Sequence, residues 1–225
     1  MLAVTNLHVA IQSIPVLRGV SLEVPAGEIV GLIGRNGAGK TTTLRSLVGL
    51  LPVRAGAIEF GGRNLLRVPP HGRAALGIGY MPEERRLIPA LTVEENVLVP
   101  AWATHIPDAR DRLRHIYAAI PEVEAMADRK ALQLSGGQQK LVALARALMA
   151  GTRLLLLDEP FEGVAPALSH RLAEVIAGLK GVGLSVLIAE SDLKHVARLV
   201  HRTYVIERGA IMPNGAAPTQ GGDSP

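Results

Sequence analysis

The chain has 225 residues, a length that allows one sizeable core or one large domain with a smaller inserted subdomain. It contains no cysteine, which excludes disulfides, zinc–thiolate sites and iron–sulfur clusters and fits a reducing cytosol. The formal net charge of +4 is spread without a basic block, so nucleic acid is not an expected partner.

The first sixty residues predict strands on both sides of a turn. Alternating apolar residues at 7–11 and at 20–24 predict two short, half-buried strands of an antiparallel edge region. The continuous apolar run at 29–33 predicts a buried strand, and the apolar spacing from Leu44 to Leu51 predicts a helix. A glycine-rich loop therefore lies between a buried strand and a helix.

This loop fits the phosphate-loop pattern in the place where that pattern works. Its glycines would let backbone N–H groups surround phosphates, and the positive end of the helix would add to the attraction. Lys40 would reach the β- and γ-phosphates, Thr41 would ligate Mg²⁺, and Thr42 could donate to a phosphate oxygen. The matching residues are Gly34, Arg35, Asn36, Gly37, Ala38, Gly39, Lys40 and Thr41.

The middle of the chain, about 83–132, predicts a mostly helical insertion. Thr92 and Glu95 form a capping-box pattern, and Leu113, Ile116 and Tyr117 begin an apolar helical stripe. Further on, helices at about 135–148 and 168–179 alternate with apolar strands at 154–157 and 184–189. This alternation predicts an α/β fold with a mainly parallel sheet, covered on both faces and binding ligands at the carboxyl ends of its strands.

Two carboxylates follow the apolar strand at 154–157. Asp158 would hold Mg²⁺, and Glu159 would be free to polarise the attacking water. An ordinary strand meeting a solvated turn would look the same, but the phosphate loop favours the catalytic interpretation.

Three motifs in this order resemble the nucleotide-binding subunits of ABC transporters: the phosphate loop, Leu134-Ser135-Gly136-Gly137-Gln138, and the strand ending in Asp158-Glu159-Pro160. The resemblance runs from about residue 2 to 212. It implies a single ATPase domain with a P-loop NTPase (RecA-like) core at about 1–82 and 146–212, and a helical subdomain at about 83–145. Residues 213–225, rich in small and polar types, are expected to be a disordered tail without function.

The same resemblance implies partners and a location. Two such subunits pack head to tail, so that Ser135, Gly136, Gly137 and Gln138 contact the nucleotide on the partner's phosphate loop, and the pair hydrolyses ATP with Mg²⁺. Transmembrane permease subunits and, indirectly, a periplasmic solute-binding protein complete the transporter. The chain would lie at the cytoplasmic face of the inner membrane, and a homodimer and a heterodimer both stay open.

Two segments are similar to the branched-chain amino acid importer subfamily. Glu83 stands where the glutamine of the family's Q-loop is usual, and it could accept a hydrogen bond from Mg²⁺-bound water or touch the transmembrane partner. Phe161-Glu162-Gly163-Val164-Ala165-Pro166 resembles the subfamily's D-loop. The resemblance implies import of branched-chain amino acids or related small polar solutes.

Two positions depart from the family pattern. Ile11 stands where an aromatic residue would stack on adenine, so stacking is lost, although simple strand packing explains this residue equally well. Ser191 stands where a switch histidine would contact the γ-phosphate; it either donates a hydrogen bond there or caps a helix through Leu193 and Val200. His195 is a weaker candidate for a substitute switch.

Other functions remain open at this level. An exporter subunit would carry the same motifs. A soluble ABC-type ATPase acting on nucleic acid or translation would normally bring coiled-coil insertions or a basic stripe, which are not visible. A regulatory subunit without hydrolysis is suggested by Ile11 and Ser191 but opposed by Lys40, Asp158 and Glu159.

Overall fold

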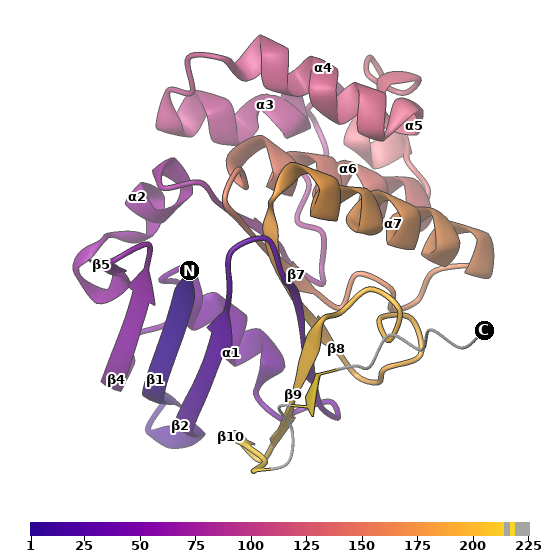
Figure 1. Ribbon diagram of the computed structural model, residues 1–225. Coiled ribbons are helices and arrows are strands. Elements are labelled where there is room, and N and C mark those ends of the chain that lie inside the picture. The colour runs from indigo at the N-terminus through magenta and orange to yellow at the C-terminus, as the bar shows by residue number, and fades with distance from the viewer. Residues whose placement is uncertain (214–216, 219–225) are drawn as a thin grey trace.

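The computed structural model describes residues 1–213 and 217–218, and it contains two β-sheets surrounded by helices (Figure 1). The first is a four-stranded antiparallel sheet in the order β2-β1-β4-β5. Its two long strands extend well beyond the short strands predicted, and β4 was not predicted at all, because in its first half no residue is fully buried to mark an apolar face. The strands are β1 Leu2–Ile11, β2 Ile14–Val24, β4 Val53–Phe60 and β5 Arg63–Asn64.

The second sheet is mainly parallel, in the order β10-β9-β3-β8-β7-β6, as the alternation of strands and helices predicted. Its central strand, β3, pairs in parallel with both β8 and β9. The strands are β3 Ile29–Ile33, β6 Ile78–Met81, β7 Leu154–Asp158, β8 Ser185–Glu190, β9 Arg202–Glu207 and β10 Ala210–Ile211.

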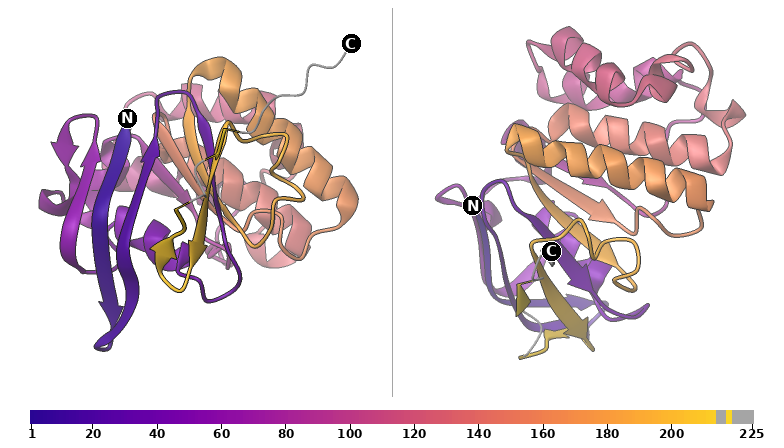
Figure 2. Two further views of the ribbon diagram at one scale, coloured as in Figure 1. Left: turned by 60° about the horizontal axis from the view of Figure 1, so that its bottom comes forward. Right: turned by 45° about the vertical axis from the view of Figure 1, so that its right-hand side comes forward.

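The helices form layers on the parallel sheet. Helices α6 and α7 lie against it, and α3, α4 and α5 lie beyond α6 on the side away from the strands (Figures 1 and 2). The short 3-10 helices are η1 Leu65–Arg67, η2 Ala131–Gln133 and η3 Leu179–Val182. The α-helices are α1 Lys40–Leu47, α2 Pro70–Ala75, α3 Val93–Thr104, α4 Ala109–Ala119, α5 Pro121–Glu124, α6 Gly136–Ala150 and α7 Pro166–Gly178.

Two hydrophobic cores lie on opposite faces of the parallel sheet. Because successive strand residues point to opposite faces, Leu155 and Leu157 pack into the core with α6 and α7, while Leu154 and Leu156 pack into the core with α1 and the antiparallel sheet. Both cores are built almost entirely from aliphatic side chains. Helix α1, and with it the phosphate loop, is thereby held between the two sheets.

Two expectations about the last third of the chain were wrong in part. Residues 191–199 form bends and turns rather than the helix that Ser191 would cap, and it is Asp192, not Ser191, whose side chain accepts from a following backbone N–H, that of Lys194. In the segment expected to have no structure, Ala217–Pro218 pairs with β9 as strand β11, since β9 offers an open edge there. The remainder of that segment beyond Pro213 lies outside the described residues.

Candidate nucleotide site

The phosphate loop follows β3 and leads directly into α1, so its backbone N–H groups and the positive end of α1 face one cavity. Gly37 and Gly39 adopt left-handed backbone angles, with φ of 80° and 113°. The φ of Gly39 favours glycine at this position, and a Cβ there would also lie 2.8 Å from a methyl carbon of Leu17. The cavity measures about 360 Å³ and is lined by Val16, Asn36, Gly37, Gly39, Lys40, Thr41, Thr42, Glu83 and Glu159.

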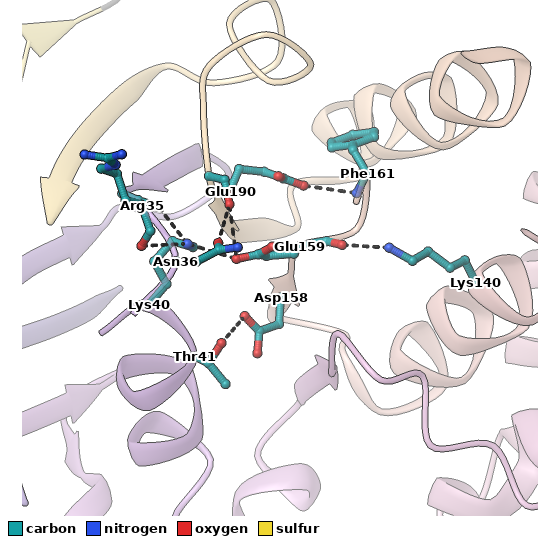
Figure 3. A network of polar contacts seen from close by, with 11 residues as sticks. Arg35, Asn36, Lys40, Thr41, Lys140, Asp158, Glu159, Phe161 and Glu190 are labelled. Carbon is teal, nitrogen blue, oxygen red and sulfur yellow. Dashed lines mark hydrogen bonds and ion pairs between the residues drawn. The ribbon is translucent and has the colours of Figure 1, made fainter. Parts of the chain in front are cut away.

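Lys40 and Glu159 form a buried ion pair in this cavity, with 2.9 Å between Nζ and Oε1 (Figure 3). Lys40 Nζ also donates to the carbonyl oxygens of Gly34 at 2.6 Å and Arg35 at 3.3 Å. Glu159 was predicted to polarise the attacking water, and its pairing with Lys40 was not predicted. The pairing follows from the fold, because β7 and β3 end at the same edge of the sheet.

The carboxylate of Asp158 lies between two hydroxyl groups. Thr41 Oγ1 donates to Oδ1 at 3.0 Å, and the hydroxyl of Tyr80 donates to Oδ2 at 3.0 Å. Burial raises the pKa of Asp158, and burial together with the Asp158 charge raises the pKa of Tyr80, which therefore stays protonated as a donor. Tyr80 was not predicted; its place in β6, which pairs with β7, was the available signal.

Hydroxyl and carboxylate oxygens side by side are the donor set that Mg²⁺ prefers, so Thr41 and Asp158 fit that ion. Glu83 is exposed at the rim of the same cavity. One carboxylate oxygen each from Glu83, Glu159 and Glu162 lies within 4.8 Å of the others.

The carboxylates of Glu159 and Glu162 lie close enough to shift each other's pKa. Hydrogen bonding to Glu159, then burial, raises the pKa of Glu162 to about 7. For Glu159 burial acts to raise the pKa, but hydrogen bonds from Glu162 and Lys40 outweigh it and lower the pKa. Glu159 is therefore the member of the pair that ionises first, at lower pH than Glu162.

Ser191 lies between the phosphate loop and Glu159. Its Oγ donates to Oδ1 of Asn36 at 2.9 Å and lies 3.4 Å from Oε1 of Glu159. The backbone of Glu159 is left-handed, with φ of 48°, a costly conformation for a residue with a side chain. His195 instead stacks on Phe161, with 5.5 Å between ring centroids, so ring packing accounts for this histidine.

Residues 135–138 do not line the phosphate-loop cavity of their own chain. Ser135 caps α6 in a capping box with Gln138, as its position predicted. Arg85 joins this end of α6 to the segment that holds Glu83, donating to the carbonyl of Gly136 at 3.3 Å and to Gln139 at 3.2 Å. Ile11, 42% exposed, is also absent from the cavity lining, which contains Val16 instead.

Comparison with known proteins agrees with this geometry. A family model described as "ABC transporter" matches residues 17–162. The chain is 36% identical to the high-affinity branched-chain amino acid transport ATP-binding protein BraG of Pseudomonas aeruginosa, over 94% of the chain and 91% of BraG. It is equally 36% identical to the lipopolysaccharide export system ATP-binding protein LptB of Escherichia coli strain K12, over 97% of the chain and 91% of LptB.

Solved structures show the same fold. A structure described as the ATP binding subunit of an ABC transporter superposes with a TM-score of 0.85 at 29% identity, covering 97% of this chain and 90% of that one. The dimeric structure of MJ0796, a bacterial ABC transporter cassette, superposes with a TM-score of 0.87 at 25% identity, covering 99% and 100%. The predicted α/β P-loop architecture with its antiparallel edge sheet is confirmed.

Proposed function

This chain belongs to the ABC transporter family as an ATP-hydrolysing subunit, and from that premise we propose that it drives uptake of branched-chain amino acids or related small polar solutes. The observation that carries the enzymatic part of the proposal is the meeting of Lys40 and Thr41 with Asp158 and Glu159 at one edge of the parallel sheet. Of these four side chains, Lys40 would bind phosphate, Thr41 and Asp158 would hold Mg²⁺, and Glu159 would act on water. Such a set suits phosphoryl transfer to water.

Each residue has a separate task in the proposed reaction. The loop amides and Lys40 bind the phosphates of ATP, and Thr41, Asp158 and Glu83 would hold Mg²⁺ and its water shell. The ion would neutralise charge on the phosphates. Phosphate binding draws Lys40 away from Glu159, whose carboxylate then accepts a proton from the attacking water.

The second catalytic half would come from another ATPase subunit packed head to tail. In support, the run at 135–138 lies outside the cavity of its own chain and forms the start of α6, the end of a helix that attracts anions. The structural relative MJ0796 is described as dimeric. Ser135, Gly136, Gly137 and Gln138 would thus contact the partner's nucleotide, and either a copy of this chain or a related ATPase would serve.

Transmembrane permease subunits would dock beside Glu83, on the segment up to Val93, with the chain peripheral on the cytoplasmic face of the membrane. Across residues 1–213 and 217–218, no helix combines the length and apolar character needed to cross a bilayer. The segment offers Ile88, which is 41% exposed. Its path is fixed by Arg146, which donates to the carbonyls of Arg86 at 2.6 Å and Arg85 at 2.5 Å.

Export is the second candidate, because LptB and BraG are equally similar to this chain. Glu83 and the loop around Glu162 favour import, since both resemble the branched-chain amino acid subfamily. For import, a periplasmic solute-binding protein would deliver the solute.

Deleting the gene distinguishes import from export, because the cell then loses a different transport activity in each case. We expect cells of the source organism without it to take up less radiolabelled leucine and isoleucine, and to recover with the wild-type chain but not with Lys40→Ala. Unchanged uptake together with loss of lipopolysaccharide from the outer surface would establish export instead. ATP turnover by the purified chain, measured in parallel, tests the enzymatic part separately.

A further inference from the structure

Lys140 is a buried lysine in α6 whose ammonium group is fully used on one short loop. Its Nζ donates to the carbonyl oxygens of Glu159 at 2.8 Å, Pro160 at 3.2 Å and Glu162 at 2.6 Å. The residue is 3% exposed, and Figure 3 shows its side chain reaching from α6 to the backbone of Glu159. A lysine has three donors, and all three end on this loop.

Packing alone does not require a charge at this position. Among the described residues, no carboxylate lies within ion-pair distance of Lys140, although Glu190, Glu162 and Glu159 attract it at longer range. Burying an ammonium group without a direct counter-ion is costly, and an apolar side chain of the same length would avoid that cost. What the lysine adds is a fixed position for three carbonyl groups.

The loop that Lys140 holds contains the carboxylate proposed to activate water. Glu159 has a left-handed backbone, which persists only where surrounding contacts determine it. Lys140 supplies such a contact on one side of the loop. On the other side, Oε1 of Glu190 accepts from the backbone N–H of Phe161 at 3.0 Å.

Helix α6 also begins with the run proposed to contact the partner's nucleotide. Lys140 lies little more than one turn after Ser135, so a single rigid element joins that run to the backbone of Glu159. We infer that Lys140 is a positioning residue for hydrolysis: it fixes Glu159 against the γ-phosphate site and links its placement to the partner-facing end of α6. The inference rests on the proposed role of Glu159.

The test is Lys140→Met, which keeps the length of the side chain and removes its donors. We expect kcat for ATP to fall at least 30-fold while KM stays within twofold, because Glu159 acts on the chemical step and not on ATP binding. ATP-bound dimer should accumulate, as it would for Glu159→Gln. The matched control is Lys180→Met at an exposed lysine, which should leave both constants unchanged.

The outcomes separate this inference from the proposed function. A wild-type chain without ATP turnover, both alone and with the second ATPase subunit of its transporter, would contradict the function itself. Wild-type turnover with a Lys140→Met kcat within threefold would overturn the inference, and so would a loss confined to KM.

A second variant tests the inference if Lys140→Met folds poorly. Since the chain has no cysteine, Lys140→Cys carries a single thiol, which 2-bromoethylamine converts in denaturant to a close lysine analogue before refolding. Turnover restored by the aminoethyl group but not by an uncharged propyl group supports the inference, and equal turnover with both groups rejects it.

Discussion

Lys40 and Glu159 neutralise each other inside the nucleotide cavity, with 2.9 Å between Nζ and Oε1 and side-chain exposures of 3% and 6%. The cation proposed to bind phosphate is thus paired with the carboxylate proposed to activate water. If both roles hold, phosphate groups and Glu159 would compete for the same ammonium group, and nucleotide binding would release the base. This competition predicts that replacing Glu159 strengthens ATP binding, whereas replacing Lys40 weakens it.

Replacing Glu159 by Gln should separate binding from chemistry. The amide cannot accept a proton from water, so kcat should fall by about 10²–10⁴, the usual contribution of a general base. Because Lys40 loses a charged competitor for phosphate, ATP should bind more tightly. Steady-state hydrolysis and light scattering with ATP and Mg²⁺ check both points, and a variant that turns over ATP at the wild-type rate would exclude Glu159 as the base.

Lys40→Met should destabilise the fold as well as weaken ATP binding. It leaves Glu159 buried without its counter-ion, at a cost of about 3 kcal/mol in the free energy of unfolding. Adding Glu159→Gln removes the isolated charge, so the double variant should regain most of that stability without regaining ATP binding. Urea unfolding at pH 8 measures this. If the double variant lost as much free energy of unfolding as the two single variants together, the ion pair would be contradicted.

Glu190 should make stability depend on pH. Burial raises the pKa of Glu190 to about 7 from its ordinary 4.5, so the folded chain binds its proton more tightly than the unfolded chain does. Its contribution is therefore complete below about pH 4.5 and is lost as the pH rises through 7. Glu190→Gln has no such titrating proton. Relative to the wild type, its free energy of unfolding should therefore rise between pH 5 and 8, by at most about 3 kcal/mol. Urea unfolding at several pH values measures this. The effect would be excluded if the free energies of unfolding of the wild type and the variant differed by the same amount at every pH.

Ser191 should support turnover through its hydroxyl group. Ser191→Ala removes the donor that lies 2.9 Å from Asn36 and 3.4 Å from Glu159, and one hydrogen bond of about 1 kcal/mol corresponds to a roughly fivefold loss of kcat. Ser191→Thr keeps the hydroxyl and serves as the matched control. Equal kcat values for the alanine and threonine variants would show that the hydroxyl plays no part.

The elements around the phosphates could be predicted because local patterns determine them. The apolar strand before Gly34 and the helix cap at Ser135 each depend only on residues a few positions away in the sequence. The ion pair of Lys40 with Glu159 could not be predicted, because it depends on the order of β3, β8 and β7 in the sheet.

Residues that act across the fold were missed for the same reason. Tyr80 reaches Asp158 from a neighbouring strand, and Lys140 reaches the loop after β7 from a helix. Each is ordinary in its local sequence: a strand tyrosine and a helical lysine. The helix expected after Ser191 was wrong because apolar spacing does not distinguish a continuous helix from successive turns, such as those closed by the carbonyls of Leu193 and Val196.

The pairing of β3 sets the order in which this protein can fold during its synthesis. Ile29 pairs with Val186, and Val30 pairs with Arg202, so both neighbours of this apolar strand leave the ribosome long after it does. At about 5–20 residues per second the delay is on the order of 10 s. We expect Ile29–Ile33 to lack both of its strand partners throughout that time, and unpaired strand edges favour aggregation of a nascent chain.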